Sequence, residues 1–324
     1  MEFFLISMLN GVSYGLMLFM LSAGLTLIFS MMGVLNFAHA SFYMLGAYVG
    51  YALTDPLGFW AALCIAPLIV GALGALFERF ILRRVHPFGH VAELMITFGL
   101  SFIVLELVQL LWGRSSLDFA APSSLQGPAF TLVNHVEQGL SFVWGAVPQQ
   151  VCSSTGAAMT TVCTPFPLSR AFMMVVALVM LAGLWLLLKR SRIGLLIQAA
   201  ISHPHMVEAL GHNLPGIFTL VFGIGTALAA LAGVVGGSVY VTEPTMAAAV
   251  GAVVFVVVVV GGLGSLSGAF AASLLIGVMQ TFAVASDLKF NGIALAQIAP
   301  ILPYLLLVLV LTVKPEGLFG ARRD

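Results

Sequence analysis

Long apolar stretches, separated by short polar connections, run through almost the whole chain. A stretch of about 20 apolar residues is long enough to cross the hydrocarbon core of a membrane as a helix. Nine stretches of roughly this kind lie at residues 5–30, 37–54, 60–82, 91–112, 167–188, 215–240, 246–262, 266–284 and 294–312. The pattern predicts an all-α, polytopic membrane helical bundle of about 8–9 transmembrane helices, built as a single transmembrane domain over residues 1–324. Eight full spans with one broken element in residues 1–54 fit the same pattern.

Two polar segments are longer than the other connections. Residues 113–166 are rich in Ser, Gly and Pro and carry little charge, which predicts an extracytoplasmic insertion. Cys152 and Cys163 lie within it and are either bonded, as cysteines are in an oxidising compartment, or two free thiols in a flexible loop. Residues 189–214 form the second polar segment, which we expect on the opposite side of the membrane.

Composition excludes a soluble protein. The 324 residues are 61% hydrophobic and 7% charged, with a mean hydropathy of +1.12. A soluble domain carries roughly 25% charged residues, so this chain lacks the polar surface to face water. The formal net charge is zero and no basic run indicates nucleic-acid binding.

The distribution of basic residues predicts the orientation. Cytoplasmic loops hold the excess of Lys and Arg. Nine of the twelve basic residues form three short clusters, after the third, fifth and last predicted spans: Arg79, Arg83, Arg84; Lys189, Arg190, Arg192; Lys314, Arg322, Arg323. Alternation of the nine spans brings all three clusters to one side, so we expect that side and the C-terminus to be cytoplasmic. Arg114, Arg170 and Lys289 remain outside the clusters.

The segment 189–214 has the signals of a short helix that lies along the membrane surface. Pro204 is suited to the first position of a helix, and Gly211 to the residue after its end. Pro215 then stops any continuation. An ordinary connector between two spans is the alternative interpretation.

The residues around Asn36 interrupt an apolar run and are candidates for a substrate path. Asn36 is a good helix N-cap residue, and a helix that begins there directs its positive end back along the chain. Broken helices of transporters bind substrate carboxylates with such ends, although a tight turn between two spans explains the same residues. His39 is either a titratable group or a hydrogen-bonded packing residue.

Two further positions belong to the same hypothesis. Thr97 shares a helix face with Ser101, where either contacts a path or another helix. Glu106 lies in apolar sequence, where an ionisable residue is costly and often functional. It either faces the path or reaches the outer interface.

The glycine cluster near residue 262 predicts a turn rather than a nucleotide site. A phosphate-binding loop needs a lysine before its Ser or Thr, and the sequence from 256 to 268 contains none. Gly261, Gly262 and Gly264 suit a structural turn between two closely packed spans. No metal-ligand spacing and no Ser-His-Asp arrangement is visible, so we expect a protein that is not an enzyme and holds no cofactor or metal.

Nine landmarks in order carry a family resemblance from residue 11 to residue 320, with most of 113–166 excluded. They are Gly11–Leu16, Gly24–Phe29, Gly33–His39, Glu78-Arg79 with Arg83-Arg84, Ile96–Leu100, Ala209–Asn213, Leu231–Val234, Gly261–Leu266 with Gly268-Ala269, and Pro315–Gly320. The run Asn-Phe-Ala-His at 36–39 is the most specific. The chain resembles a permease subunit of the branched-chain amino-acid ABC importers, of the high-affinity leucine, isoleucine and valine type, found in the bacterial inner membrane.

The resemblance implies a set of partners and a mechanism. A second homologous permease completes the pore, two ATPase subunits bind ATP, and an external binding protein delivers the substrate. Substrates of the family are branched-chain amino acids or related small carboxylates and amides. Gln198 and Val254 depart from the usual residues of the family, which leaves the choice among these substrates open.

The resemblance also implies roles for the candidate residues. The segment from His203 to Gly211 becomes the coupling helix that contacts an ATPase. The coupling residues are His203, Pro204, Glu208, Ala209, Gly211 and His212. The substrate-path candidates are Asn36, Phe37, His39, Thr97 and Glu106. A secondary transporter or channel for small polar solutes is the alternative, with Glu106 as its ionisable group.

Overall fold

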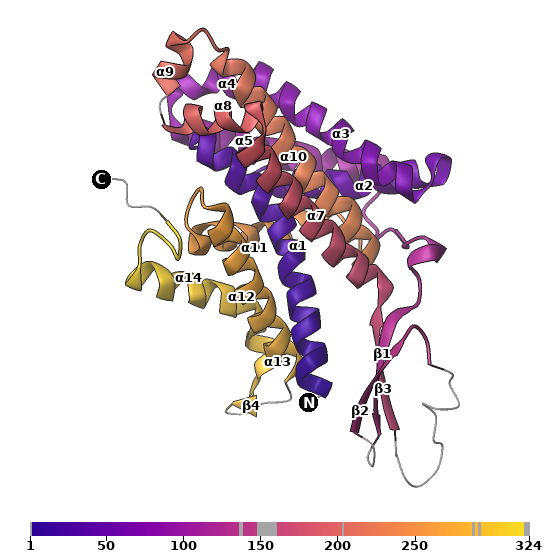
Figure 1. Cartoon of the computed structure of the whole chain (residues 1–324). Coiled ribbons are helices and arrows are strands. Elements are labelled where there is room, and N and C mark those ends of the chain that lie inside the picture. Colours follow the sequence, from indigo (N-terminus) through magenta and orange to yellow (C-terminus); the bar gives the residue numbers. More distant parts are fainter. Residues whose placement is uncertain are drawn as a thin grey trace.

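The computed structural model describes residues 2–135, 139–147, 161–202, 204–286, 289–290 and 293–320. Helices make up most of this part of the chain, and a small sheet projects from one end (Figure 1). The long helices are α1 (Glu2–Met32), α2 (His39–Leu57), α3 (Phe59–Phe77), α5 (His90–Trp112), α7 (Leu168–Arg190), α10 (Leu214–Val239), α11 (Met246–Gly261), α12 (Leu266–Ala285) and α14 (Leu302–Val313). Each of the nine predicted spans overlaps one of these long helices, so the predicted helical bundle is confirmed.

Shorter elements connect them. The helical ones are the π-helix η1 (Glu78–Leu82), α4 (Arg83–Val85), η2 (His86–Phe88), η3 (Ser123–Leu125), α8 (Arg192–Ser202), α9 (Pro204–Ala209), α13 (Leu295–Ile298) and η4 (Ala299–Ile301). The strands are β1 (Pro128–His135), β2 (Gly139–Trp144), β3 (Thr161–Pro167), β4 (Lys289–Phe290) and β5 (Ile293–Ala294).

Among the described residues, seven helical segments are long and apolar enough to cross a membrane. Two predicted spans fall short of that standard. Helix α11 has only 16 residues, and the 19-residue α2 is less apolar than the others. The last predicted span is not continuous either, because α13, η4 and α14 share it, with Pro300 and Pro303 at the breaks.

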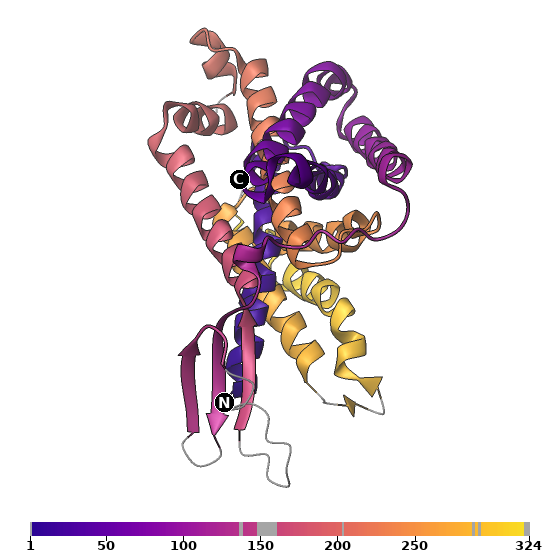
Figure 2. The same ribbon diagram turned by 90° about the vertical axis from the view of Figure 1, so that its right-hand side faces the viewer.

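Helix α1 runs through the middle of the molecule (Figures 1 and 2). It packs on α12, α10, α7 and α11, and its residues from Gly15 to Ile28 are buried. Small residues allow the close contacts. A Cβ on Gly24 would lie 2.3 Å from the carbonyl oxygen of Gly225 on α10, so only glycine fits there. In a membrane the hydrophobic effect does not drive helices together, so close packing at small residues such as glycine stabilises their association.

The insertion between α5 and α7 contains a three-stranded antiparallel sheet, in the order β2-β1-β3. The polar, turn-rich sequence of residues 113–166 predicts an insertion, but it does not by itself predict strands. Strand β3 continues directly into α7, and Thr164 on β3 donates a hydrogen bond to Glu2 at the start of α1. The sheet therefore lies beside the N-terminus of the chain (Figure 2).

The short helices α4, α8 and α9 gather at the opposite end of the molecule (Figure 1). We call this the basic end, because it carries Arg83 and Arg84 on α4 and Arg192 on α8. Of the third predicted basic cluster, Lys314 follows α14, while Arg322 and Arg323 lie outside the described residues.

Candidate functional site

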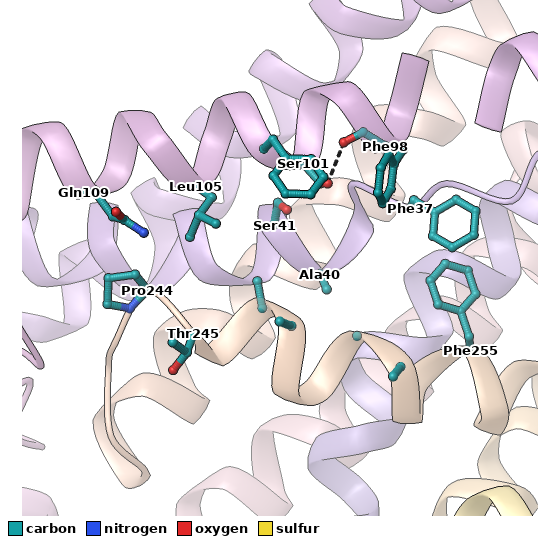
Figure 3. Close-up of a pocket in the computed structure, with 15 residues that line it drawn as sticks. Phe37, Ala40, Ser41, Phe98, Ser101, Leu105, Gln109, Pro244, Thr245 and Phe255 are labelled. Carbon is teal, nitrogen blue, oxygen red and sulfur yellow. Dashed lines mark hydrogen bonds between the residues drawn. The ribbon is translucent and has the colours of Figure 1, made fainter. Parts of the chain in front are cut away.

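A cavity of about 400 Å³ lies between α2, α5 and α11. Small residues of α2 and α11 form one side of it, and larger side chains of α5 form the other (Figure 3). The lining residues are Phe37, Ala40, Ser41, Phe98, Ser101, Phe102, Leu105, Gln109, Pro244, Thr245, Ala247, Ala248, Gly251, Ala252 and Phe255. None of these carries a charge, so the α2–α5–α11 cavity suits a small solute with a large apolar part.

An aromatic cluster forms one end of this cavity. The ring centroid of Phe37 lies 4.9 Å from that of Phe255 and 6.3 Å from that of Phe98. The rings belong to three separate segments, the turn before α2, α5 and α11. A small rotation of any of these helices changes the width of the cavity at this point. Gln109 and Thr245 lie at the other end (Figure 3).

Asn36 shapes the turn that presents Phe37 to the cavity. Its side chain is fully buried, and its Oδ1 accepts a hydrogen bond from the N–H of Ala38 at 3.0 Å. Helix α2 begins at His39, with Ala38 as its N-cap. The expectation that a helix starts at Asn36 is therefore wrong, because the side chain closes a tight turn instead.

Thr97 connects that turn to α5. Its buried hydroxyl accepts a hydrogen bond from the N–H of Phe37 at 3.3 Å and donates to the carbonyl of Glu93 at 3.0 Å. Thr97 is thus adjacent to the cavity without lining it. Ser101, one turn further along α5, does line it.

The other two path candidates lie away from the cavity. His39 is buried against α1, where its Nε2 lies 3.0 Å from the carbonyl oxygen of Leu21. Glu106 is exposed on the outer side of α5, beside a second hollow that Arg114 also lines. The structure therefore brings Asn36, Phe37 and Thr97 together and leaves His39 and Glu106 apart.

The segment after α8 exposes apolar side chains at the basic end. Helix α9 is followed by Gly211, whose φ of +82° is in the left-handed region that glycine favours. Met206 is 64% exposed and Leu210 77% exposed, while Glu208, Ala209 and His212 are exposed as well. His203 lies outside the described residues. An apolar surface of this kind, on a short helix with polar neighbours, is typical of a docking site.

Asn213 joins this segment rigidly to α10. Its Oδ1 accepts a hydrogen bond from the N–H of Gly216 at 3.1 Å and so caps α10. Helix α10 packs on α1, α2 and α3. The cap therefore links the exposed segment to a helix that packs inside the bundle.

A partly buried ion pair holds the start of α10 against the end of α3. Glu78, 1% exposed, lies on the π-helix η1 and accepts hydrogen bonds from Arg83 through both carboxylate oxygens, at 3.3 and 3.0 Å. Arg83 also donates to the carbonyl of Pro215 at 2.6 Å, and the hydroxyl of Thr219 contacts both charged groups. The sequence placed Glu78 beside Arg79, but its partner is Arg83, which the extra residue of the π-helix brings into reach.

Gly261 is the last residue of α11, and Gly262 and Gly264 lie in the turn between α11 and α12. The φ angles are +104° at Gly262 and +85° at Gly264. The turn also receives the C-terminal tail, because the N–H of Leu318 donates to Val260 at 2.8 Å. Ser30 at the end of α1 donates to the carbonyl of Gly264 at 3.0 Å. The turn thus joins α1, α11, α12 and the tail.

The disulfide between Cys152 and Cys163 stays a prediction. Cys163 lies on β3, and Cys152 lies outside the described residues. Cys64 is a free thiol on α3.

Several site residues were not predicted from the sequence. Phe98, Gln109 and Phe255 line the cavity. Gln109 follows Ser101 by two helical turns on the face that Thr97 and Ser101 share, so this spacing is a signal that could have found it. Phe98 and Phe255 are apolar residues among apolar neighbours, where no periodicity marks the face that lines a cavity.

Thr219 was also missed. Its partners Glu78 and Arg83 lie more than a hundred residues away in the chain, so no local pattern connects them to it.

Known proteins resemble the chain over nearly its whole length. The model of the family described as "Branched-chain amino acid transport system / permease component" matches residues 7–311. The high-affinity branched-chain amino acid transport system permease protein BraD of Pseudomonas aeruginosa is 29% identical over 328 residues, which cover 98% of this chain and 96% of BraD. The corresponding protein LivH of Escherichia coli K12 is 28% identical over 333 residues, with 98% and 96% covered. Among solved structures, PsaBC from Streptococcus pneumoniae in complex with Fab is 11% identical and covers 96% of this chain and 92% of that one, with a TM-score of 0.47.

Proposed function

Because the chain belongs to the branched-chain amino acid transport permease family, we propose that it is the transmembrane subunit of an ATP-binding-cassette importer. Its substrates are branched-chain amino acids or related small carboxylates and amides. The observation that carries the proposal is the family match over residues 7–311, which includes both the α2–α5–α11 cavity and the exposed segment at the basic end.

The α2–α5–α11 cavity is the proposed substrate path. An aliphatic side chain is stabilised by the apolar lining at roughly 25 cal/mol per Å² of surface removed from water. Ser41, Ser101, Gln109 and Thr245 supply hydroxyl and amide groups for the polar end of the substrate. Phe37, Phe98 and Phe255 form the constriction that opens and closes.

The α9 segment is the proposed contact with an ATPase subunit. We define it as residues 204–212, with the exposed Met206, Glu208 and Leu210 as its contact residues. An ATPase that closes on ATP shifts α9 and, through the cap at Asn213, α10. The partner then supplies the free energy that shifts the chain between its outward-open and inward-open states. It does so by binding the two states with different affinity, because only such a difference shifts an equilibrium between them.

A second permease is the proposed neighbour of α5. Helix α5 has few buried residues, and Glu106 lies on its exposed side. A carboxylate that faces lipid is costly, whereas the same group at a protein interface finds polar partners. The position of Glu106 away from the α2–α5–α11 cavity also removes the main argument for an ion-coupled secondary transporter.

The remaining partners follow from the same proposal. An external binding protein delivers the substrate on the side of the sheet, and the two ATPase subunits act at the basic end. The basic end and the C-terminal tail are cytoplasmic, and the chain is a multi-pass protein of the bacterial inner membrane. The chain itself carries out no catalysis, because ATP hydrolysis belongs to the partners.

Reconstituted transport tests this function. The chain is purified with its co-expressed partner subunits and placed in proteoliposomes that contain ATP. Uptake of radiolabelled leucine is expected only when ATP, the ATPases and the binding protein are all present. Uptake by the chain alone, or uptake driven by a proton or sodium gradient without ATP, would reject the proposal in favour of a secondary transporter or channel.

A further inference from the structure

A further cavity, of about 520 Å³, lies where the ends of α7, α10 and α12 meet α1 and η4. We call it the Arg170 cavity. Its larger polar lining groups are Asn10, Tyr14, Arg170, Tyr240 and Gln280. The rest of the described lining is small or apolar, and comprises Thr281, Val284, Ala285, Ala296, Ala299 and Pro300. No residue that lines the α2–α5–α11 cavity belongs to this set.

Arg170 is the one charged group among the described residues that line this cavity. Its Nη1 donates a hydrogen bond to Oδ1 of Asn10 at 2.6 Å. Within the part of the chain that the structure describes, no carboxylate lies at ion-pair distance from Arg170. A guanidinium carries five N–H donors in a fixed fork, so Asn10 alone leaves most of its binding capacity unused.

The surroundings of Arg170 strengthen its preference for an anion. Arg170 is half-buried and lies in the first turn of α7, where the helix dipole adds positive potential. Removal of a cation from water is costly unless a negative group lies nearby. Tyr14 and Tyr240 contribute hydroxyl groups that are able to donate hydrogen bonds to the same anion.

The position of the cavity defines the side from which a ligand arrives. Strand β3 runs directly into α7, so Arg170 lies at the sheet end of the molecule. It also lies outside the three basic clusters that the positive-inside rule explains. This assignment to the outer side depends on the orientation in the proposed function, whereas the chemistry of the cavity does not.

We propose that the Arg170 cavity binds an oxyanion attached to an aliphatic group, on the outer side of the membrane. Arginine recognises carboxylates and phosphates through two parallel hydrogen bonds. The wall formed by Val284, Ala296 and Pro300 accommodates the aliphatic part. Two sources supply this chemistry, the carboxylate of a small aliphatic acid and the phosphate of an anionic lipid.

The test uses the full chain in lipid nanodiscs. In the first arm the nanodiscs contain only phosphatidylcholine, and calorimetry measures binding of 4-methylpentanoate, with the neutral 4-methylpentanamide as its matched control. In the second arm phosphatidylglycerol is mixed with phosphatidylcholine, and native mass spectrometry counts the anionic lipids that stay bound. Neither arm needs ATP or a partner, so each gives a result even if the proposed transport function fails.

The variants separate recognition from folding. In the arm where the unchanged chain binds its ligand, Arg170→Gln is expected to lower the affinity by about tenfold or more. This is the usual effect of losing a charge-assisted hydrogen bond. Arg170→Lys keeps the charge and is expected to retain part of the affinity. Arg114→Gln changes another basic residue outside the clusters and is expected to bind like the unchanged chain. Size-exclusion profiles verify that each variant is folded.

The outcomes are distinct. Binding of the acid but not the amide identifies a carboxylate site, and retention of phosphatidylglycerol identifies a lipid site. Absence of oxyanion binding in both arms would overturn the proposal. Equal binding by the unchanged chain and by folded Arg170→Gln would overturn it as well.

Discussion

At the scale of single residues, Asn36 acts through the turn that it closes. Asn36 is fully buried and is absent from the cavity lining, yet the next residue, Phe37, forms part of the aromatic constriction. The hydrogen bond that Asn36 Oδ1 accepts from the N–H of Ala38 closes the turn that contains Phe37. The sequence indicated the right segment and left two interpretations open, a helix N-cap that binds substrate and a tight turn between two spans. The structure has the tight turn, and a role of Asn36 in the path stays a prediction.

We expect Asn36→Leu to lower uptake by at least about tenfold while the subunit still assembles. The substitution removes the acceptor for the N–H of Ala38, and a buried unsatisfied donor costs about 1–3 kcal/mol. Asn36→Ser is the matched control, because serine forms a similar but weaker turn. Initial rates of leucine uptake, normalised to protein in the membrane, are the measurement. Unchanged kinetics in Asn36→Leu would show that the turn has no part in the path.

The aromatic constriction leads to a prediction about specificity. Phe255→Ala removes the ring that lies 4.9 Å from Phe37 and widens that end of the cavity. We expect a several-fold lower apparent affinity for leucine, because the substrate loses apolar contact, and stronger inhibition by phenylalanine. Competition against labelled leucine uptake measures both. Phe142→Ala, on the exposed sheet, is the control. An unchanged competition profile in Phe255→Ala would exclude this end of the cavity from the path.

At the scale of elements, the positions of the helices in the sequence could be predicted, but the side of each helix that lines the cavity could not. Every predicted span overlaps a long helix, because long apolar runs leave few alternatives in a membrane. The rotation of α11 was not predictable, since this helix is apolar all round and shows no stripe. Helix α5 carries Thr97, Ser101 and Gln109 on one face, but the sequence does not say whether that face meets a path or another helix. The cavity, which depends on three such rotations, was therefore missed, and so was the sheet within residues 113–166.

The turn after α9 leads to a prediction about coupling. We expect Gly211→Pro to leave insertion intact but to separate ATP hydrolysis from uptake, because proline cannot adopt the φ of +82° and loses the N–H that bonds to Glu208. The ratio of leucine transported to ATP hydrolysed should fall severalfold. Gly58→Pro is the matched control, since Gly58 ends α2 with a φ of +81° at a connection remote from α9. An equal fall in both variants would argue for general strain rather than for coupling.

The contact between η1 and α10 leads to a prediction about stability. Arg83→Gln leaves Glu78 buried without its cationic partner. Loss of one partner of a fully buried pair costs about 3–5 kcal/mol, and we expect about half of that because Arg83 is 36% exposed. The midpoint of thermal unfolding in detergent should therefore fall by several degrees. The double variant Glu78→Gln with Arg83→Gln should recover much of the loss, and a double variant less stable than the single one would contradict this account of the ion pair.

At the scale of the whole molecule, the two ends carry different candidate binding sites. The sheet end combines the sheet with the Arg170 cavity, and the basic end combines exposed apolar residues of α9 with the ion pair that holds α10. From the basic clusters, the sequence predicts that the basic end is cytoplasmic, and this orientation stays a prediction. The central claim is that the basic end receives energy from a nucleotide-hydrolysing partner through residues 204–212.

Site-directed photo-crosslinking from position 210 tests that claim most directly. Leu210 is 77% exposed and does not support the core of the bundle, so a photoreactive residue in its place leaves the fold intact. In native membranes, illumination is expected to join the chain to a nucleotide-binding subunit, and the yield should change when ATP is added. The same probe in place of Trp144 on the sheet should give no such product. A product at position 210 that contains only lipid or an external protein would contradict the account.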